Sequence, residues 1–171
     1  MLEIYNLKEK LEFIEEVATL TQREWGQAGL TEEQFKNKVN KKIEKIKNGF
    51  ENKFYCKLIL VEDNTLIGFI SIFPTDGEER KDLSPWYATM YVKEKYRGKG
   101  YSKILNNAIL NEARRRGIQR LYLKTDLENY YEKFGARYIE KLSNGEKLYC
   151  IDLWKVVKYH KIKDRRGYKW I

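Results

Sequence analysis

The sequence predicts one α/β domain on a mixed, largely antiparallel sheet that is flanked by helices. Three features support this prediction: short apolar segments of strand length, longer segments with helical periodicity, and a basic glycine loop that joins a strand directly to a helix. The expected order is β-α-α-β-β-β-α-β-α-β-β, in which the helix after the glycine loop bridges one parallel pair of strands. We expect this domain over residues 1–154, with a basic extension over residues 155–171 that packs on the domain or trails from it.

The N-terminal third predicts a strand followed by two helices. Residues 1–5 suit a short strand, and apolar residues recur at helical spacing over residues 7–25. Thr31 and Gln34 form the capping-box pattern that begins a second helix, because each side chain can bond the backbone amide of the other. Gly49 is the expected end of this helix.

The middle of the chain predicts three strands. Residues 54–62 and 66–73 flank a turn of three polar residues, so they predict a hairpin. Residues 74–85 are polar and charged, which is typical of a loop. Residues 86–92 are almost entirely apolar and aromatic, as expected of a central strand that is covered on both faces.

The helix after that strand shows one apolar face, and Gly117 is its expected end. Residues 118–125 suit a strand and residues 128–134 a short helix. Residues 136–142 and 146–154 surround an Asn-Gly turn, which strongly predicts a hairpin.

Composition limits the possible classes of protein. The chain is 42% hydrophobic with 2 prolines, which excludes a disordered or fibrous protein. Its 34 basic and 25 acidic residues give a net charge of +9, which suits a phosphorylated ligand, nucleic acid or an anionic surface. The 2 cysteines show no CxxC spacing, so we expect neither disulfides nor a metal site. We expect a cytoplasmic protein without a signal peptide or membrane span.

The loop Arg97-Gly98-Lys99-Gly100 predicts a phosphate site. The first amide groups of a helix lack internal partners and attract anions, while glycines let the backbone approach a ligand closely. Arg97 and Lys99 add cationic donors. The loop lacks the spacing of a mononucleotide loop, and Lys103 stands where the dinucleotide pattern needs its third glycine.

Two stretches resemble the GNAT superfamily of N-acetyltransferases. In residues 90–102, a strand leads into the loop, and Arg97 and Gly100 match the family's Arg/Gln-x-x-Gly-x-Gly/Ala motif. Ser102 departs from the usual glycine or alanine. The second stretch, residues 130–136, is similar to a family motif at the expected distance; its matching residues are Tyr131, Glu132, Lys133 and Gly135, whereas Ala136 replaces an aromatic.

The resemblance implies an enzyme that transfers an acetyl group from acetyl-CoA to a primary amine of a small molecule or peptide, by direct attack in a ternary complex. Tyr131 would protonate the departing thiolate. The residues implied to bind acetyl-CoA are Met90, Tyr91, Val92, Arg97, Gly98, Lys99, Gly100, Tyr101 and Ser102. Residues 82–86 also look like a bacterial branch of the family without an assigned substrate.

Several alternatives stay open. The base that deprotonates the amine could be Asp82, Asp126, Glu128 or a water chain. The acceptor and the oligomeric state are open as well. The resemblance places Trp25 and Phe35 near the acceptor site, although we expect both in the core. Two other functions compete: a nucleic-acid-associated protein that binds RNA or acetylates charged tRNA through its basic extension, and an acyl-CoA sensor without turnover.

Overall fold

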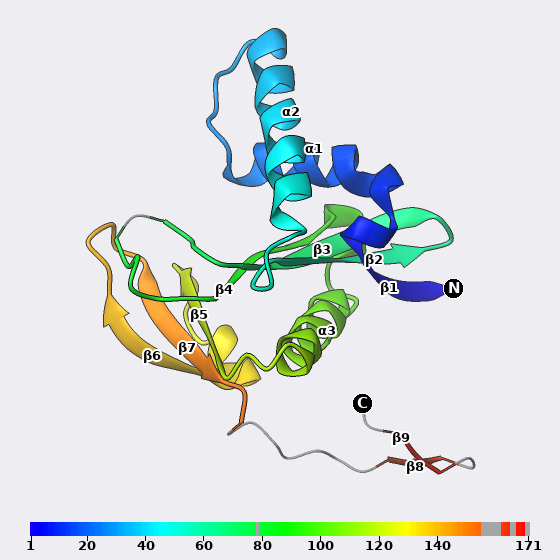
Figure 1. The fold of residues 1–171 in the computed structure, drawn as a ribbon, viewed down its shortest axis with the longest axis vertical. Helices are drawn as coiled ribbons and strands as arrows, with labels where there is room; N and C mark the ends of the chain where they lie inside the picture. Colours follow the sequence, from blue (N-terminus) through cyan, green and yellow to red (C-terminus); the bar gives the residue numbers. More distant parts are fainter. Residues whose placement is uncertain (78, 155–161, 165–166, 170–171) are drawn as a thin grey trace.

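A seven-stranded sheet in the order β1-β2-β3-β4-β5-β7-β6 runs through the protein (Figure 1). The computed structural model describes residues 1–77, 79–154, 162–164 and 167–169. All neighbouring strands are antiparallel except β4 and β5, which are parallel, so the predicted mixed sheet is confirmed. The strands are β1 (Leu2–Asn6), β2 (Cys56–Glu62), β3 (Thr65–Phe73), β4 (Trp86–Val92), β5 (Arg120–Thr125), β6 (Ala136–Lys141) and β7 (Lys147–Asp152).

Helices cover both faces of the sheet. The helices α1 (Ile14–Trp25) and α2 (Glu32–Gly49) lie on one face, and α3 (Tyr101–Arg115) lies on the other (Figure 1). The predicted capping box begins α2: Gln34 N donates to Thr31 Oγ1 at 3.3 Å, and Thr31 N donates to Gln34 Oε1 at 3.0 Å. Because α3 connects two parallel neighbours, it must cross over the sheet between them.

Three predicted boundaries differ from the structure. The helix predicted from residue 7 begins as two 3-10 turns, η1 (Leu7–Glu9) and η2 (Leu11–Phe13), because Lys10 between them has non-helical dihedrals of −138° and 60°. The short helix predicted over residues 128–134 is a 3-10 turn, η4 (Tyr131–Phe134). β2 starts two residues late, at Cys56, because Asn52 Oδ1 accepts from the amide of Phe54 at 2.8 Å and holds a turn there.

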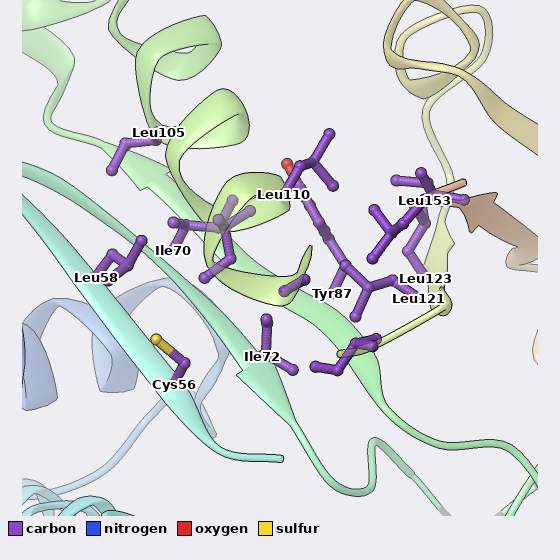
Figure 2. Close-up of a cluster of buried hydrophobic side chains, with 14 of the residues drawn as sticks. Cys56, Leu58, Ile70, Ile72, Tyr87, Leu105, Leu110, Leu121, Leu123 and Leu153 are labelled. Atoms are coloured by element: carbon purple, nitrogen blue, oxygen red, sulfur yellow. The ribbon is translucent and has the colours of Figure 1, made fainter. Parts of the chain in front are cut away.

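Two apolar clusters fill the space between the sheet and its helices. Alternate side chains of β2 and β3 point to opposite faces, as strand geometry requires. Figure 2 shows the cluster beneath α3, where Leu105 and Leu110 pack over Ile70 and Ile72. The second cluster joins α1 and α2 to the other face; its fully buried members are Leu7, Val17, Ala18, Ile59 and Phe69. Together they fix the helices against the middle of the sheet.

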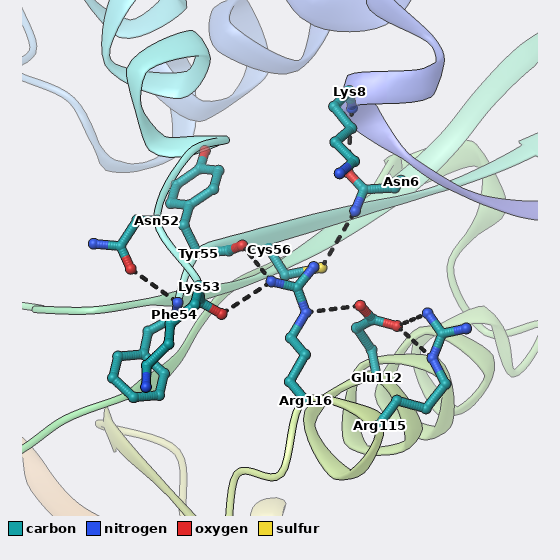
Figure 3. Close-up of polar contacts among 10 residues, drawn as sticks. All are labelled: Asn6, Lys8, Asn52, Lys53, Phe54, Tyr55, Cys56, Glu112, Arg115 and Arg116. Atoms are coloured by element: carbon teal, nitrogen blue, oxygen red, sulfur yellow. Dashed lines mark hydrogen bonds and ion pairs between the residues drawn. The ribbon is translucent and has the colours of Figure 1, made fainter.

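Charged groups tie the end of α3 to the chain before β2 (Figure 3). Arg116 Nη1 donates to the carbonyl oxygens of Lys53 at 3.1 Å and Tyr55 at 2.9 Å, while its Nε donates to Glu112 at 2.7 Å. Arg115 donates to Glu112 as well, with Nε at 2.9 Å. The predicted cluster of arginines at this helix end therefore has a structural role.

The basic extension falls largely outside the described residues. Two short strands are described there, β8 (Ile162–Asp164) and β9 (Gly167–Lys169), and they pair antiparallel with Ile162 opposite Lys169. His160 lies outside the described residues. The division into a domain over residues 1–154 and an extension over residues 155–171 stays a prediction.

Candidate active site

The glycine loop lies between β4 and α3, as the sequence predicts. Gly98 and Gly100 have φ of 77° and 81°, in the left-handed region that disfavours residues with a Cβ. A Cβ added to either glycine would meet no atom within 4 Å. Gly100 is the N-cap of α3, and no side chain caps the first turn. The first amide groups of α3 are therefore available to an anion.

The two cations of the loop are exposed at the same place. Arg97 Nε donates to the carbonyl of Val92 at 2.9 Å, which closes the loop onto the end of β4. Lys99 Nζ lies 5.7 Å from the ring centre of Tyr96, in the 3-10 turn η3 (Glu94–Tyr96) that precedes the loop. The predicted phosphate-binding residues thus lie together at the start of α3. They continue into the helix as Tyr101 and Ser102, which are half-buried.

β4 and β5 diverge next to this loop. Within the described chain, the two strands pair at one position, Trp86 opposite Tyr122. The first half of β4 is buried, whereas Met90, Tyr91 and Val92 are half-buried, so the predicted cover on both faces holds only for the first half. The edge of β4 that faces β5 has no ladder partner along this second half, which leaves backbone groups free for a ligand.

A β-bulge interrupts β4 at its middle. Ser71 of β3 lies opposite Ala88. The next pair is Phe69 opposite Tyr91, so β4 carries one residue more than β3 between these pairs. Thr89, inside the bulge, has a φ of 49°, a conformation that a β-branched residue rarely adopts. The bulge redirects the backbone of the part of β4 that the sequence assigns to cofactor binding.

Tyr131 lies in η4, on the face of the sheet that α3 covers. Its ring contacts Tyr87 of β4 edge-on, with centroids 5.6 Å apart, and Tyr130 with centroids 4.9 Å apart. Burial, and then the neighbouring Tyr130, raises the pKa of Tyr131 to about 12. The hydroxyl is therefore protonated at neutral pH, as a proton donor must be.

The carboxylates considered as bases lie in exposed positions. Asp82 accepts from Arg80 Nε at 2.8 Å and from Nη2 at 2.7 Å, and these hydrogen bonds lower its pKa. The hydrogen bond from Lys147 likewise lowers the pKa of Glu128. Asp126 is exposed beyond the end of β5. The ion pairs make the first two weaker bases than free carboxylates.

The sequence did not reveal a polar group on the opposite face of the sheet. Lys57 of β2 is buried, and its Nζ donates to Ser71 Oγ at 2.5 Å and Thr89 Oγ1 at 3.4 Å. The core prediction for Trp25 is wrong: this side chain is 48% exposed and borders a cavity that Lys57 and Thr89 also line. Phe35 packs against the cluster below α1 and α2. A lysine within an otherwise apolar strand is the signal that could have pointed to this site, although the sequence analysis did not use it.

Comparison with known proteins gives the family. The Acetyltransferase (GNAT) family profile matches residues 14–136, which include the loop, the bulge and Tyr131. The chain belongs to this family. It is therefore an acyl-CoA-dependent N-acetyltransferase, with acetyl-CoA as co-substrate and an amine as acceptor. The nucleic-acid and sensor alternatives are not favoured by this match.

Individual relatives agree with the GNAT assignment. The spermine/spermidine N(1)-acetyltransferase of Bacillus subtilis is 29% identical over 112 residues, which cover 60% of this chain and 74% of the relative. An N-acetyltransferase structure from Staphylococcus aureus covers 90% of this chain and 99% of its own, with a TM-score of 0.67 and 18% identity. The PaiA N-acetyltransferase of Thermoplasma acidophilum, in complex with coenzyme A, covers 89% and 99%, with a TM-score of 0.62 and 23% identity. At these identities, the two structures support the fold.

In residues 1–77, 79–154 and the two short strands beyond, no helix is long and apolar enough to cross a membrane. In the same part of the chain, no group of three or more His, Cys, Asp or Glu side chains is placed to hold a metal ion.

Proposed function

We propose that acetyl-CoA lies across the glycine loop and along the open edge of β4, with Tyr131 beside the reacting thioester. The observation that carries this proposal is the uncapped start of α3, which follows the strand whose edge diverges from β5. A pyrophosphate suits the amide groups there and the two loop cations. The pantetheine arm suits the unpaired backbone of β4. The residues assigned to acetyl-CoA are Met90, Tyr91, Val92, Arg97, Gly98, Lys99, Gly100, Tyr101 and Ser102.

The reaction forms one C–N bond, breaks one C–S bond and needs three proton movements. The amine nitrogen attacks the thioester carbonyl carbon in a ternary complex, and the C–S bond breaks with its electron pair on sulfur. Tyr131 gives its proton to this thiolate and regains one from solvent. A backbone amide of β4 after the bulge stabilises the negative charge on the carbonyl oxygen. The amine loses its own proton to a water chain or Asp126, because Asp82 and Glu128 are held in ion pairs.

The acceptor in this proposal is the primary amine of a small molecule. The Bacillus subtilis relative is named for spermine and spermidine, so polyamines are the first acceptors to compare. A cytoplasmic location also belongs to this proposal; it agrees with Cys56 and Cys150, which are buried free thiols.

Thermal unfolding with acetyl-CoA, CoA and ATP tests the cofactor site. A ligand at 100 times its dissociation constant stabilises a protein by about 2.7 kcal/mol. We expect both CoA forms to raise the midpoint of the wild type and ATP to have less effect. Gly100→Glu should abolish the rise, because it places a carboxylate beside the amide groups that bind phosphate.

Gly145→Glu is the matched control. Gly145 has a φ of 93° in the turn between β6 and β7, and a Cβ there also meets no atom within 4 Å. It should cost similar stability and keep the full response to acetyl-CoA. No response of the wild type at millimolar acetyl-CoA would refute the proposed site.

A further inference from the structure

A cavity of about 420 Å³ opens on the face of the sheet that α1 and α2 cover. Thr89, the residue in the bulge of β4, lines this cavity. The bulge therefore connects two features. The edge of β4 proposed to bind acetyl-CoA follows it in the chain, and the cavity is lined by its residue Thr89. An acceptor held in this cavity would lie close to the part of β4 where the thioester is proposed to lie.

The floor of the cavity carries a buried lysine without an acidic partner. Lys57 is 1% exposed, and its Nζ lies 5.0 Å from the ring centre of Phe69 and 5.4 Å from that of Phe73. Its hydrogen bonds go to the hydroxyl groups of Ser71 and Thr89. Among the described residues, the groups that act on its charge are Cys56 and Lys42, and neither is a carboxylate. A buried ammonium without an anion is unfavourable, and an anionic ligand group would relieve this cost.

Two further lysines line the same cavity from α2. Lys42 and Lys45 project from this helix, and none of the lining residues is an aspartate or glutamate. Asp76, just beyond the lining residue Thr75, lies 4.0 Å from Lys124; burial raises its pKa, while the charges of Lys124 and Lys45 lower it. Lysines therefore outnumber this one carboxylate around the cavity, which favours anions over polycations.

An aromatic wall completes the cavity. Tyr55, one of the residues that line it, is 8% exposed. The ring of Tyr55 stacks on Phe73 with centroids 5.7 Å apart, and Trp25 closes another side. These rings offer an apolar surface to the body of a ligand.

We infer that the acceptor is an amine that carries an anionic group, a carboxylate or a phosphate, on an apolar or aromatic body. The anionic group pairs with Lys57 and with the lysines of α2. This inference rests on the proposed acetyl transfer. It separates the chain from its polyamine-acetylating relative, because spermine and spermidine carry only positive charges, which Lys42 and Lys45 repel.

Pairs of acceptors that differ by one anionic group test the inference. We would measure kcat/KM with L-phenylalanine against phenethylamine, phosphoethanolamine against ethanolamine, and spermidine. At least one acceptor with an anionic group should exceed its partner without that group by about tenfold, which corresponds to one good charge pair, and should exceed spermidine as well. The carboxylate and phosphate arms identify which anion is bound. Equal or higher kcat/KM for the members without an anionic group or for spermidine would overturn the inference, as would the absence of turnover with every acceptor that carries an anionic group.

Variants locate the effect. Lys57→Met keeps the length of the side chain in its apolar surroundings and should reduce the anionic preference to about threefold or less. Lys45→Glu, at an exposed position that cannot disturb the core, should lower the preference and improve turnover of spermidine. Lys41→Met on the exposed face of α2 is the control and should change neither. An unchanged preference in both cavity variants would contradict the assignment.

Acetyl-CoA binding separates this inference from the proposed function. If acetyl-CoA raises the unfolding midpoint but the anionic acceptors are not preferred, the substrate class is wrong and the cofactor site stands. If acetyl-CoA has no effect on the midpoint, the proposed function itself fails.

Discussion

Tyr131 packs edge-on against Tyr87, with ring centroids 5.6 Å apart, and this contact places the proposed proton donor beside β4. Tyr87 is itself fixed, because its hydroxyl donates to Asn106 of α3 at 3.1 Å. Tyr130 holds the other side of the Tyr131 ring. Ring packing therefore positions Tyr131, and its hydroxyl is the group proposed to protonate the departing thiolate.

The first prediction concerns the hydroxyl of Tyr131. Tyr131→Phe keeps both ring contacts and removes the proton donor, so kcat should fall by about 10²-fold or more, in the range of general acid catalysis. The unfolding midpoint and the KM for acetyl-CoA should change little. Steady-state kinetics and thermal unfolding measure these effects.

Tyr130→Phe is the control for this change. Tyr130 packs on Tyr131 and on Phe134, and the variant keeps both ring contacts. Its kcat should stay close to that of the wild type. Equal losses in the two variants would indicate a packing effect and remove the assigned role of Tyr131.

The second prediction links Gly49 to the cavity. A Cβ at this last residue of α2 would lie 2.8 Å from the ring of Tyr55, which Phe50 and Phe73 hold from other sides. Gly49→Ala should therefore displace Tyr55, lower stability by about 1–2 kcal/mol despite the better helix propensity of alanine, and raise the KM of the acceptor. The KM for acetyl-CoA should not change. Lys47 is exposed and lies two residues before Gly49 on α2, so Lys47→Ala should leave both KM values unchanged.

Local signals explain what the sequence could predict. Gly98 and Gly100 adopt the left-handed conformations that their residue type allows, and Thr31 caps its helix through a residue three positions away. Each of these features depends on a few neighbouring residues. The strand pairing of β4 and β5 followed from the helix between them. The conformation of the glycine loop was therefore predictable from its own residues.

Long-range packing explains what was missed. Thr89 bulges out of β4 with a positive φ, although threonine normally favours regular strands. Trp25 matches the helical periodicity of core residues, yet α1 ends at the rim of the cavity and leaves its ring half exposed. A lysine in a strand is normally expected to be solvated, but residues of α1, α2 and the bulge surround Lys57 and bury it. These positions depend on how helices sit on the sheet, which residue patterns do not encode.

The third prediction compares two arginines at the end of α3. Arg116 bridges Glu112 and the carbonyl groups of Lys53 and Tyr55, whereas Arg115 is 77% exposed on its side chain and bonds Glu112 alone. Arg116→Ala should lower the free energy of unfolding by about 2–3 kcal/mol, because it leaves two carbonyl groups without their charged donor and removes one of the two arginines that bond Glu112. Arg115→Ala should cost less than about 1 kcal/mol. Denaturant unfolding of both variants measures these free energies. An equal loss of stability in the two variants would contradict the prediction.

The last prediction is a pH dependence of stability that originates at Lys57. The pKa of Lys57 is lowered from 10.5 to about 7, mainly by burial, with Cys56 acting in the opposite direction and Lys42 in the same direction. Between pH 7 and 10.5 the unfolded chain keeps this proton and the native protein releases it. Stability therefore rises with pH in this window, by at most about 1.4 kcal/mol per pH unit from this one group.

Measurements from pH 7 to 9 isolate this effect. Burial raises the pKa of Cys56 to about 12 and that of Tyr131 to about 12, so neither group ionises in the native protein over this range. Lys57→Met removes the titrating group and fills its apolar surroundings, so the difference in unfolding free energy between the wild type and this variant should change with pH in favour of the wild type. Lys41 is exposed on α2, so the unfolding free energy of the control Lys41→Met should change with pH as that of the wild type does. A constant difference for Lys57→Met would show that the lysine stays charged in the native protein, and the cavity would then need an anion already within reach of its Nζ.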